Sequence, residues 1–305
     1  MSADKPLVSI VVPTYKRSDR IRVALDSIAA QDYGAENIEL IVVSDNRPEW
    51  PESAETDAAV APYAASLPHF RLLHTSGQTG GGAARNYACR QATGEYLTFL
   101  DDDDEFLPDK VSTQVAFMQE NSLDMSWQDV SWYDERGRLV EHRRLDHCED
   151  FSTEGLLRAH LLTPISPTAI YMLRRDLFDR TEGFGEVATG QDWWLMLRCI
   201  EAGAHMGYMS EVHVRQYLHS GERLSLGKNK VNGEVARHEV VRGYYPRLSK
   251  KDVRYIEFRH NAVLAFAMKR SNQPGQAVIY ALKAIASSPA ACVSEALKFF
   301  GKAKS

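Results

Sequence analysis

The chain has 305 residues, of which 44% are hydrophobic and 25% are charged, a profile typical of a globular protein with a sizeable core. Its four cysteines form no CxxC pair, which argues against a zinc site and a disulfide framework. No window approaches the run of about 18 apolar residues that spans a bilayer, and residues 1–6 carry no apolar core of a signal peptide. We therefore expect one large α/β domain or two smaller ones, in the cytoplasm, with reduced thiols.

The formal net charge of −5 is distributed unevenly along the chain. Residues 234–305 contain 13 Lys/Arg and 5 Asp/Glu, a net charge of +8, which leaves −13 for residues 1–233. This change of sign predicts a first domain over residues 1–233 and a basic C-terminal extension over residues 234–305. The extension either contacts an anionic surface, such as a membrane leaflet, or forms a solvated helical face.

The first 110 residues alternate predicted strands and helices. A continuous apolar run at 7–12 and a second run at 38–43 are of the buried-strand type, a further strand is predicted at 96–100, and 70–73 is a candidate short strand. Predicted helices contain residues 21–28 and 83–93, and a third opens at Pro108. Ser18 and Asp19 are candidate caps of the first helix, Pro13 is expected to end the first strand, and Gly94 to end the second helix. This alternation predicts an α/β fold with a Rossmann-like, mostly parallel sheet flanked by helices.

Beyond residue 110 the pattern is less regular. Its predicted elements are a strand at 127–133, an irregular loop at 163–167 and a helix at 191–202. From Glu234 the chain is predicted to be helical almost to its end, with breaks near Pro246 and Pro274.

Polar residues follow three of the predicted parallel strands, at Pro13-Thr14-Tyr15, Asp45-Asn46 and Asp101–Asp104. In such sheets ligands bind beyond the carboxyl ends of the strands. Four consecutive aspartates repel one another when ionised, and a hard divalent cation such as Mg²⁺ or Mn²⁺ relieves that repulsion. The alternative is a solvated acidic loop. An EF-hand starting at Asp101 is excluded, because Phe106 and Ser112 occupy the positions that need Gly and Glu.

At this point the chain resembles the family 2 glycosyltransferases of GT-A fold. The blocks that carry the resemblance are Val8–Tyr15, Ile41–Asp45, Ala84-Arg85-Asn86 and Gly94–Asp104, the last two similar to the family's ARN and FLDxDD motifs. The resemblance is strong over residues 7–110 and looser to about residue 228. It implies a nucleotide-sugar-binding half over residues 1–110 and an acceptor-binding half over residues 111–233, with the helical extension behind them.

The resemblance also implies roles for individual residues. Asp103 would be the main metal ligand, with His219 reaching the metal or the diphosphate. The donor nucleotide sugar would be bound by a set of residues around these two: Pro13, Thr14, Tyr15, Asp45, Arg85, Asp101, Asp102 and Arg223. Within that set Asp45 would contact the base and Asp102 the ribose. Gln216 and Tyr217 stand where the family often has a Tyr-Arg pair.

Asp192 lies where the family places its catalytic base, usually as Glu-Asp, but the preceding residue here is Gln191. Its position in the first turn of a predicted helix gives a separate argument, because the helix dipole favours the ionised carboxylate there. An ionised carboxylate accepts a proton from an attacking hydroxyl. An ordinary first-turn aspartate is the alternative reading.

The expected function is metal-dependent, inverting transfer of a hexose from a nucleoside-diphosphate sugar, expected to be a UDP-sugar, to a glycan or lipid-linked acceptor in polysaccharide biosynthesis. Acceptor choice is expected to depend on residues 125–190. No nucleic acid partner is expected, while peripheral contact with the inner face of the membrane and homo-oligomerisation are both compatible with the chain. The alternatives are a noncatalytic nucleotide- or sugar-binding protein and a sugar-nucleotide pyrophosphorylase, although no glycine-rich signature follows the first strand.

Overall fold

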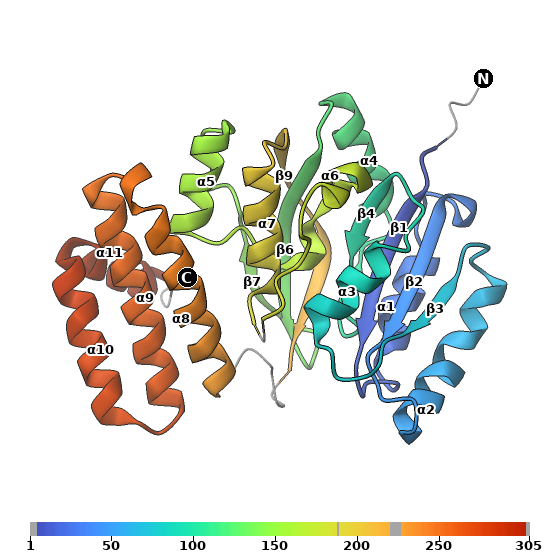
Figure 1. The fold of residues 1–305 in the computed structure, drawn as a ribbon, viewed down its shortest axis with the longest axis horizontal. Coiled ribbons are helices and arrows are strands. Elements are labelled where there is room, and N and C mark those ends of the chain that lie inside the picture. Colours follow the sequence, from blue (N-terminus) through green and yellow to red (C-terminus); the bar gives the residue numbers. More distant parts are fainter. Residues whose placement is uncertain (1–4, 188, 220–226, 303–305) are drawn as a thin grey trace. The chain divides into compact units, whose positions relative to one another are not determined.

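A computed structural model of the chain describes residues 5–187, 189–219 and 227–302 (Figure 1). The described residues divide into two compact units. The first contains those within 1–160, 165–186 and 191–220, and the second those within 161–164, 187–190 and 221–305. The predicted domain boundary after Gly233 lies inside a helix of the second unit.

The first unit is built on one nine-stranded sheet with the order β3-β2-β1-β4-β8-β6-β9-β5, to which β7 adds by pairing with β6. The strands are β1 (Val8–Thr14), β2 (Ile38–Ser44), β3 (Arg71–His74), β4 (Tyr96–Phe99), β5 (Glu105–Phe106), β6 (Met125–Asp134), β7 (Leu139–Arg143), β8 (Met172–Arg174) and β9 (Met206–Leu218). The first four are mutually parallel, whereas β8 pairs antiparallel with β4 and β6, and β6 and β9 are parallel. The predicted α/β fold with a mostly parallel sheet is confirmed.

The helices that precede residue 202 are α1 (Ile21–Ala29), α2 (Pro51–Val60), α3 (Gly81–Cys89), α4 (Lys110–Glu120), α5 (Thr153–Leu162), α6 (Arg175–Asp179) and α7 (Gln191–Glu201). Among them, helices α1, α3, α4 and α6 pack against strands of the sheet (Figure 1). Short 3₁₀ turns lie at Ala35–Asn37, Ala61–Ala65, Thr168–Ile170 and Tyr245–Arg247. Helices α3 and α7 contact each other, which brings two widely separated parts of the sequence together.

The four apolar runs of the N-terminal part form strands as predicted, but β1 does not end at Pro13. It continues to Thr14, with Pro13 in register with Val43 of β2. The proline is tolerated because β4 pairs with β1 only as far as Val11, so no ladder bond is required of its missing N–H. One consequence is that Thr14 belongs to the strand end itself and is buried.

Two predicted helix ends are also wrong. The N-cap position of α1 is Arg20, without a side-chain cap, and the Ser18 hydroxyl instead donates to Glu55 at 3.1 Å. Helix α3 ends at Cys89, before Gly94. Gly94 has a different role: its N–H donates to Ser9 Oγ at 2.9 Å, and a Cβ there would lie 2.6 Å from the Ser9 nitrogen. A glycine is needed because the chain passes directly against β1.

The second unit contains the helices α8 (Gly227–Gly243), α9 (Lys250–Arg270), α10 (Pro274–Ser287) and α11 (Pro289–Lys302). The predicted breaks near Pro246 and Pro274 are confirmed, and a further break separates α10 from α11 at Ser288. Among the described residues, no single helix is long and apolar enough to cross a membrane. Helix α10 and the part of α11 up to Glu295 meet that criterion only as a pair, and their axes bend by 109°.

Candidate functional site

The loop after β4 meets the end of β1. Thr14 Oγ1 donates to Asp102 Oδ2 at 2.7 Å, and both residues are at most 5% exposed. Because β1 and β4 are parallel neighbours, their carboxyl ends lie at the same edge of the sheet. The structure therefore brings together Thr14 and the aspartate run, as the strand pattern predicts.

Arg17, in the loop after β1, joins two of the aspartates. Its Nη1 lies 3.0 Å from Asp102 Oδ1 and 2.7 Å from Asp103 Oδ2. The Asp103 side chain is only 16% exposed, so this ion pair is partly shielded from water. Sequence reasoning missed Arg17, although its place three residues after the end of the strand that adjoins β4 was an available signal.

His219 approaches Asp103 from the end of β9. Its Nε2 lies 3.5 Å from Asp103 Oδ2, and its Nδ1 lies 4.0 Å from Glu135 Oε1. Burial lowers the pKa of His219, with the charge of Asp103 acting in the opposite direction. A largely neutral imidazole nitrogen and a neighbouring carboxylate oxygen can both act as ligands of Mn²⁺. Arg223, predicted to bind the diphosphate, lies outside the described residues.

Asp104 points to a different partner. Its Oδ2 accepts from Gln216 Nε2 at 2.6 Å, and its Oδ1 accepts from the Tyr217 N–H at 3.1 Å. Gln216 in turn accepts from Trp132 Nε1 at 3.0 Å, which links the aspartate loop to β6 and β9. Asp104 is 3% exposed, and burial raises its pKa well above the usual range. Its observed contacts hold the loop on β9.

Arg85 connects the aspartate run to α7. The Nη2 of Arg85 donates to Asp101 Oδ1, and the Nη1 donates to Gln191 Oε1 at 3.0 Å. The helix start around Arg85 is crowded: a Cβ on Gly82 would lie 2.4 Å from the Gly185 carbonyl oxygen, and a Cβ on Gly81 would lie 3.1 Å from Gln191 Oε1. Because these two glycines have no side chain, they leave space for the loop that precedes α7.

Asn86, the last residue of the ARN block, holds that same loop. Its Nδ2 donates to the Phe184 carbonyl at 3.0 Å, and its Oδ1 accepts from the Phe184 N–H at 2.8 Å. Two hydrogen bonds from one buried amide to the backbone of Phe184 fix the chain seven residues before Gln191. Sequence reasoning gave Asn86 no role of its own, and these contacts make it a positioning residue for the start of α7.

Asp192 lies in the first turn of α7, as predicted. Its Oδ1 accepts from the Trp193 N–H at 2.9 Å. The residue keeps part of its surface exposed, but burial of the carboxyl group raises its pKa, and the charge of Arg85 only partly offsets this. The expectation that the helix start would favour the ionised form is therefore overridden by burial. A carboxylate with a raised pKa is a stronger proton acceptor.

Asp45 organises the loop after β3. Its Oδ1 accepts from Thr79 Oγ1 at 2.7 Å and from Thr75 Oγ1 at 2.5 Å, and its Oδ2 accepts from the Gly80 N–H at 2.8 Å. Tyr15 closes the other side of this loop by accepting from Gln78 Nε2 at 3.0 Å. The predicted contact of Asp45 with the nucleobase stays a prediction.

A cation would relieve the repulsion among the negative charges of the aspartate run. Burial raises the pKa of Asp102 to about 6, and burial together with the charge of Asp101 raises the pKa of Asp103. Arg17 supplies one positive charge, and a divalent cation at Asp103 and His219 would supply more. Within the described part of the chain no set of three or more His, Cys, Asp or Glu could hold a metal alone. Water and diphosphate oxygens would complete the shell, as is usual for Mg²⁺, so the residues present fit the expected metal.

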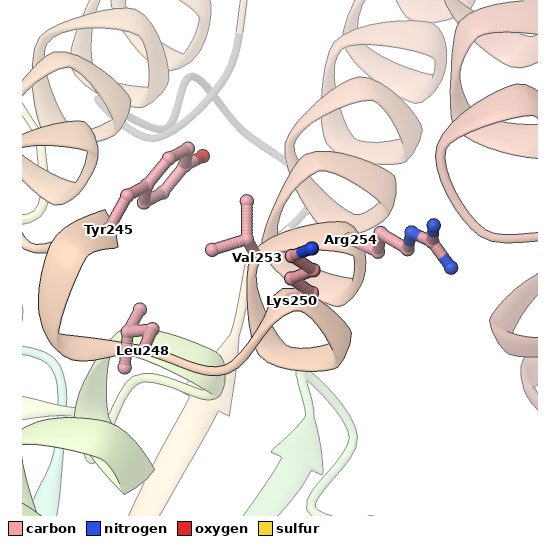
Figure 2. Close-up of a pocket in the computed structure, with 5 residues that line it drawn as sticks. All are labelled: Tyr245, Leu248, Lys250, Val253 and Arg254. Atoms are coloured by element: carbon pink, nitrogen blue, oxygen red, sulfur yellow. The ribbon is translucent and has the colours of Figure 1, made fainter.

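A pocket of about 280 Å³ lies elsewhere, in the second unit (Figure 2). It is lined by Tyr245, Leu248, Lys250, Val253 and Arg254. None of the predicted site residues contributes to it, and Arg254 extends away from the apolar side chains (Figure 2).

The family described as Glycosyl transferase family 2 matches residues 9–181, which include β1 to β4 and the whole aspartate run. The chain belongs to this family. A protein of Rickettsia bellii (strain RML369-C) named "Uncharacterized glycosyltransferase" is 31% identical over 194 residues, 59% of this chain and 26% of that protein. The Escherichia coli (strain K12) protein named "Uncharacterized glycosyltransferase YibD" is 32% identical over 126 residues, 41% of this chain and 34% of its own length. The chain thus spans only a quarter to a third of these two relatives.

Solved structures share the fold. The TarS fragment 1–349 of S. aureus in complex with UDP-GlcNAc superposes with a TM-score of 0.60 at 19% identity, covering 90% of each chain. The mannosyltransferase PcManGT of Pyrobaculum calidifontis, solved with GDP-Man and Mn²⁺, has a TM-score of 0.61 at 21% identity, covering 97% of this chain and 80% of that one. At these identities the likeness establishes the GT-A fold of this chain.

Proposed function

We propose that this protein transfers a sugar from a nucleoside-diphosphate sugar to an acceptor hydroxyl with inversion at the anomeric carbon, and that it depends on Mn²⁺ or Mg²⁺. One observation carries the proposal: side-chain contacts tie the aspartate run to the end of β1 on one side and to the start of α7 on the other. Thr14 and Arg17 engage Asp102, and Arg85 joins Asp101 to Gln191, the neighbour of Asp192. Family membership and the nucleotide-sugar complexes of the structural neighbours support the same reading.

The donor would lie along the carboxyl ends of β1, β2 and β4. Thr14, Tyr15 and Asp45 with the adjoining Pro13 would bind the nucleoside, and Asp102 the ribose. Arg85 and Arg223 are the guanidinium groups assigned to the diphosphate, since planar guanidinium groups pair well with phosphate oxygens. A UDP-sugar is the expected donor, in keeping with the UDP-GlcNAc complex of TarS.

Asp103 and His219 would hold the metal. When bound, a divalent metal supplies Lewis-acid stabilisation of the charge that develops on a departing diphosphate. Arg17 would have to release Asp103 Oδ2, which it contacts at 2.7 Å, before that oxygen becomes a ligand. In this proposal Arg17 moves away from Asp103 before the metal binds.

Asp192 would be the base. The acceptor hydroxyl attacks the anomeric carbon, its proton passes to the Asp192 carboxylate, and the bond to the nucleoside diphosphate breaks on the opposite face. A single displacement inverts the configuration and requires no covalent sugar–enzyme intermediate. The raised pKa of Asp192 suits this task, because a more basic carboxylate takes the proton more readily.

The acceptor is proposed to be a glycan or a lipid-linked sugar in polysaccharide biosynthesis, at the inner face of the membrane. A second candidate, a noncatalytic sugar- or nucleotide-binding protein on the same scaffold, has no observation of its own in its favour, since Asp103, His219 and Asp192 are all present.

A donor panel tests the proposal. The protein would be incubated with UDP-, GDP- and dTDP-sugars, Mn²⁺ and candidate glycan acceptors, and nucleoside diphosphate release would be measured. Proton NMR of the new glycosidic linkage reports its configuration. Nucleoside diphosphate with an inverted linkage supports the proposal. Pyrophosphate production would identify a pyrophosphorylase, and tight donor binding without any turnover would identify a binding protein.

A further inference from the structure

The last two helices expose an unusual number of aliphatic side chains. In α10 they are Val278, Ile279, Leu282 and Ile285, between 47% and 62% exposed, and in α11 they are Val293 and Leu297, at 61% and 68%. An exposed Leu or Val by itself is ordinary, but a set on consecutive helices marks an interaction surface. These six residues are called the aliphatic face below.

The aliphatic face is ordered by the helix repeat. At about 100° per residue, the four side chains of α10 fall within an arc of about 120°. Helix α10 contacts α9, and Ala284, on the opposite side of α10, is only 5% exposed. The aliphatic residues are therefore not the ones that hold α10 in the unit. In α11, Val293 and Leu297 are four residues apart and share one side of the helix.

Charge identifies the partner. Between Ala262 and Ser305 the chain has six Lys/Arg and one acidic residue, Glu295. Lys283 directly borders the aliphatic arc, and its ammonium lies 5.2 Å from the centre of the Tyr280 ring. Two copies of so basic a segment would repel each other, whereas an anionic lipid leaflet attracts it. Aliphatic residues bordered by lysines are typical of helices that lie in a membrane interface.

The length of α10 favours a helix that lies in the membrane interface over one that spans the bilayer. Helix α10 has 14 residues, which corresponds to about 21 Å, shorter than the roughly 30 Å of a bilayer's hydrocarbon core. Helix α11 does not extend it, because the two axes bend by 109°. Each helix would place its aliphatic side among the lipid headgroups and upper acyl chains.

We infer that the aliphatic face of α10 and α11 binds the surface of an anionic membrane. The expectation from sequence placed this contact broadly in the basic residues after 233, and the structure narrows it to these two helices. Tyr245, which also lies in the basic extension, is engaged within the unit, where its hydroxyl donates to Glu257 at 2.8 Å. The side chains of Lys298, Phe299, Phe300 and Lys302 lie outside the described ones. The inference does not depend on the proposed sugar transfer.

Co-sedimentation of the full chain with vesicles tests the inference. Phosphatidylcholine vesicles with and without phosphatidylglycerol would be compared at low and high salt. We expect binding only to the anionic vesicles, weakened by salt but retained in part, because salt does not screen apolar insertion. Ile279→Glu/Leu282→Glu should weaken binding at least about tenfold, and Ile279→Gln/Leu282→Gln, which adds no charge, should weaken it in the same direction.

The matched control is Val23→Glu/Val235→Glu. These two valines are 51% and 50% exposed, so the control makes the same chemical change at equally accessible sites on α1 and α8. It should bind vesicles within about twofold of the wild type. Circular dichroism would verify that all variants are folded, and light scattering after gel filtration would give their oligomeric state.

Three results would overturn the inference. The full chain could ignore anionic vesicles at low salt, or the control could lose binding as completely as the face variants. The wild type could also form a dimer that Ile279→Glu/Leu282→Glu dissociates without vesicle binding, which would make the aliphatic face an interface between copies of the chain. Nucleotide-sugar binding by the same samples keeps a failure here distinct from a failure of the proposed function.

Discussion

Arg85 and Gln191 are 106 residues apart in the chain, yet the guanidinium Nη1 of Arg85 donates to the amide Oε1 of Gln191 at 3.0 Å. The second guanidinium nitrogen, Nη2, holds Asp101. Through this one side chain the aspartate loop and the start of α7 become neighbours. The amide that replaces the family's usual glutamate therefore sits between Arg85 and Asp192.

Gln191→Glu tests the electrostatic role of that amide. The new carboxylate would add a negative charge beside Asp192 and would compete for Arg85, whose charge lowers the pKa of Asp192. Both effects raise the pKa of Asp192, so the acidic limb of the pH profile of kcat/KM should move to higher pH by roughly 0.5–1 unit. Gln276→Glu on α10 is the control, an identical change at an exposed position. An unmoved acidic limb would contradict the prediction.

Asp192→Asn tests the base directly. The substitution keeps the size of the side chain and its bond from the Trp193 N–H but removes the proton acceptor. Turnover should fall by roughly 10²–10⁴, the usual contribution of a general base. Donor affinity, measured by calorimetry, should change little because Asp192 would face the acceptor. The assignment is refuted by a variant that turns over at near the wild-type rate.

Asp103→Asn tests the metal site. Mn²⁺ affinity, measured by the loss of the free-ion EPR signal, should fall by at least roughly 10²-fold, because a ligand matters at least as much as the groups that orient it. The protein should stay folded, since burial and the neighbouring Asp101 already disfavour a charged Asp103, as its raised pKa shows. Asp19→Asn, at a side chain that is 79% exposed, is the control. Unchanged Mn²⁺ binding, or full activity in excess chelator, would remove Asp103 from the site.

Arg17→Met tests whether the guanidinium competes with the metal. Arg17 Nη1 and a metal would use the same Asp103 oxygen, so removing the guanidinium should tighten Mn²⁺ binding in the absence of nucleotide. Exposed ion pairs are worth about 0.2–1 kcal/mol, which corresponds to roughly a 1.5- to fivefold change in affinity, and this partly shielded pair should reach the upper end of that range. Arg22→Met, exposed on α1, is the control. Weaker Mn²⁺ binding by Arg17→Met would mean that Arg17 supports the metal.

A partly buried polar cluster between α8 and α9 should make the second unit sensitive to acid. The rings of His238 and His260 stack with their centroids 3.7 Å apart. Glu234 accepts from His260 Nδ1 at 3.0 Å and from Arg237 Nη2 at 2.7 Å. Glu257 pairs with His238 at 3.3 Å. The hydroxyl of Tyr245 also reaches Glu257. Burial and the neighbouring His260 lower the pKa of His238, whereas its partners lower the pKa of Glu234 to about 2.

Both shifts have the same sign for stability. The folded unit favours the neutral form of His238. Its stability therefore falls as the pH drops below about 6.5, the pKa of a histidine in the unfolded chain. The contribution of ionised Glu234 is complete above about 4.5 and is lost as the pH falls towards about 2. Hydrogen exchange of α8 and α9 amides should therefore accelerate between pH 7 and 5.5, after correction for intrinsic rates. Glu234→Gln should cost roughly 2–3 kcal/mol of local stability at pH 7, while Glu239→Gln, exposed on α8, should cost almost nothing.

Much of the fold and half of the site were readable from local patterns. Largely apolar runs identify β1, β2 and β4 because a strand buried on both faces has few polar positions, here Ser9, Glu39 and Thr98. Parallel connection then places Thr14, Asp45 and the aspartates at one edge. The family motifs point to Asp192 and His219 without any knowledge of the path between them. Short pieces such as β5, β7 and β8 left no such pattern, since two to five residues are too few for a period to appear.

The sequence by itself determined which residues carry charge and where the buried parallel strands lie along the chain, because an apolar run is a property of a short segment. Only the tertiary structure decided the partners of each aspartate: Arg85 for Asp101, Thr14 and Arg17 for Asp102, His219 for Asp103 and Gln216 for Asp104. Four adjacent, chemically identical side chains cannot be told apart by composition or period. What distinguishes them is the direction in which the turn after β4 points each carboxylate, and how far each is removed from water.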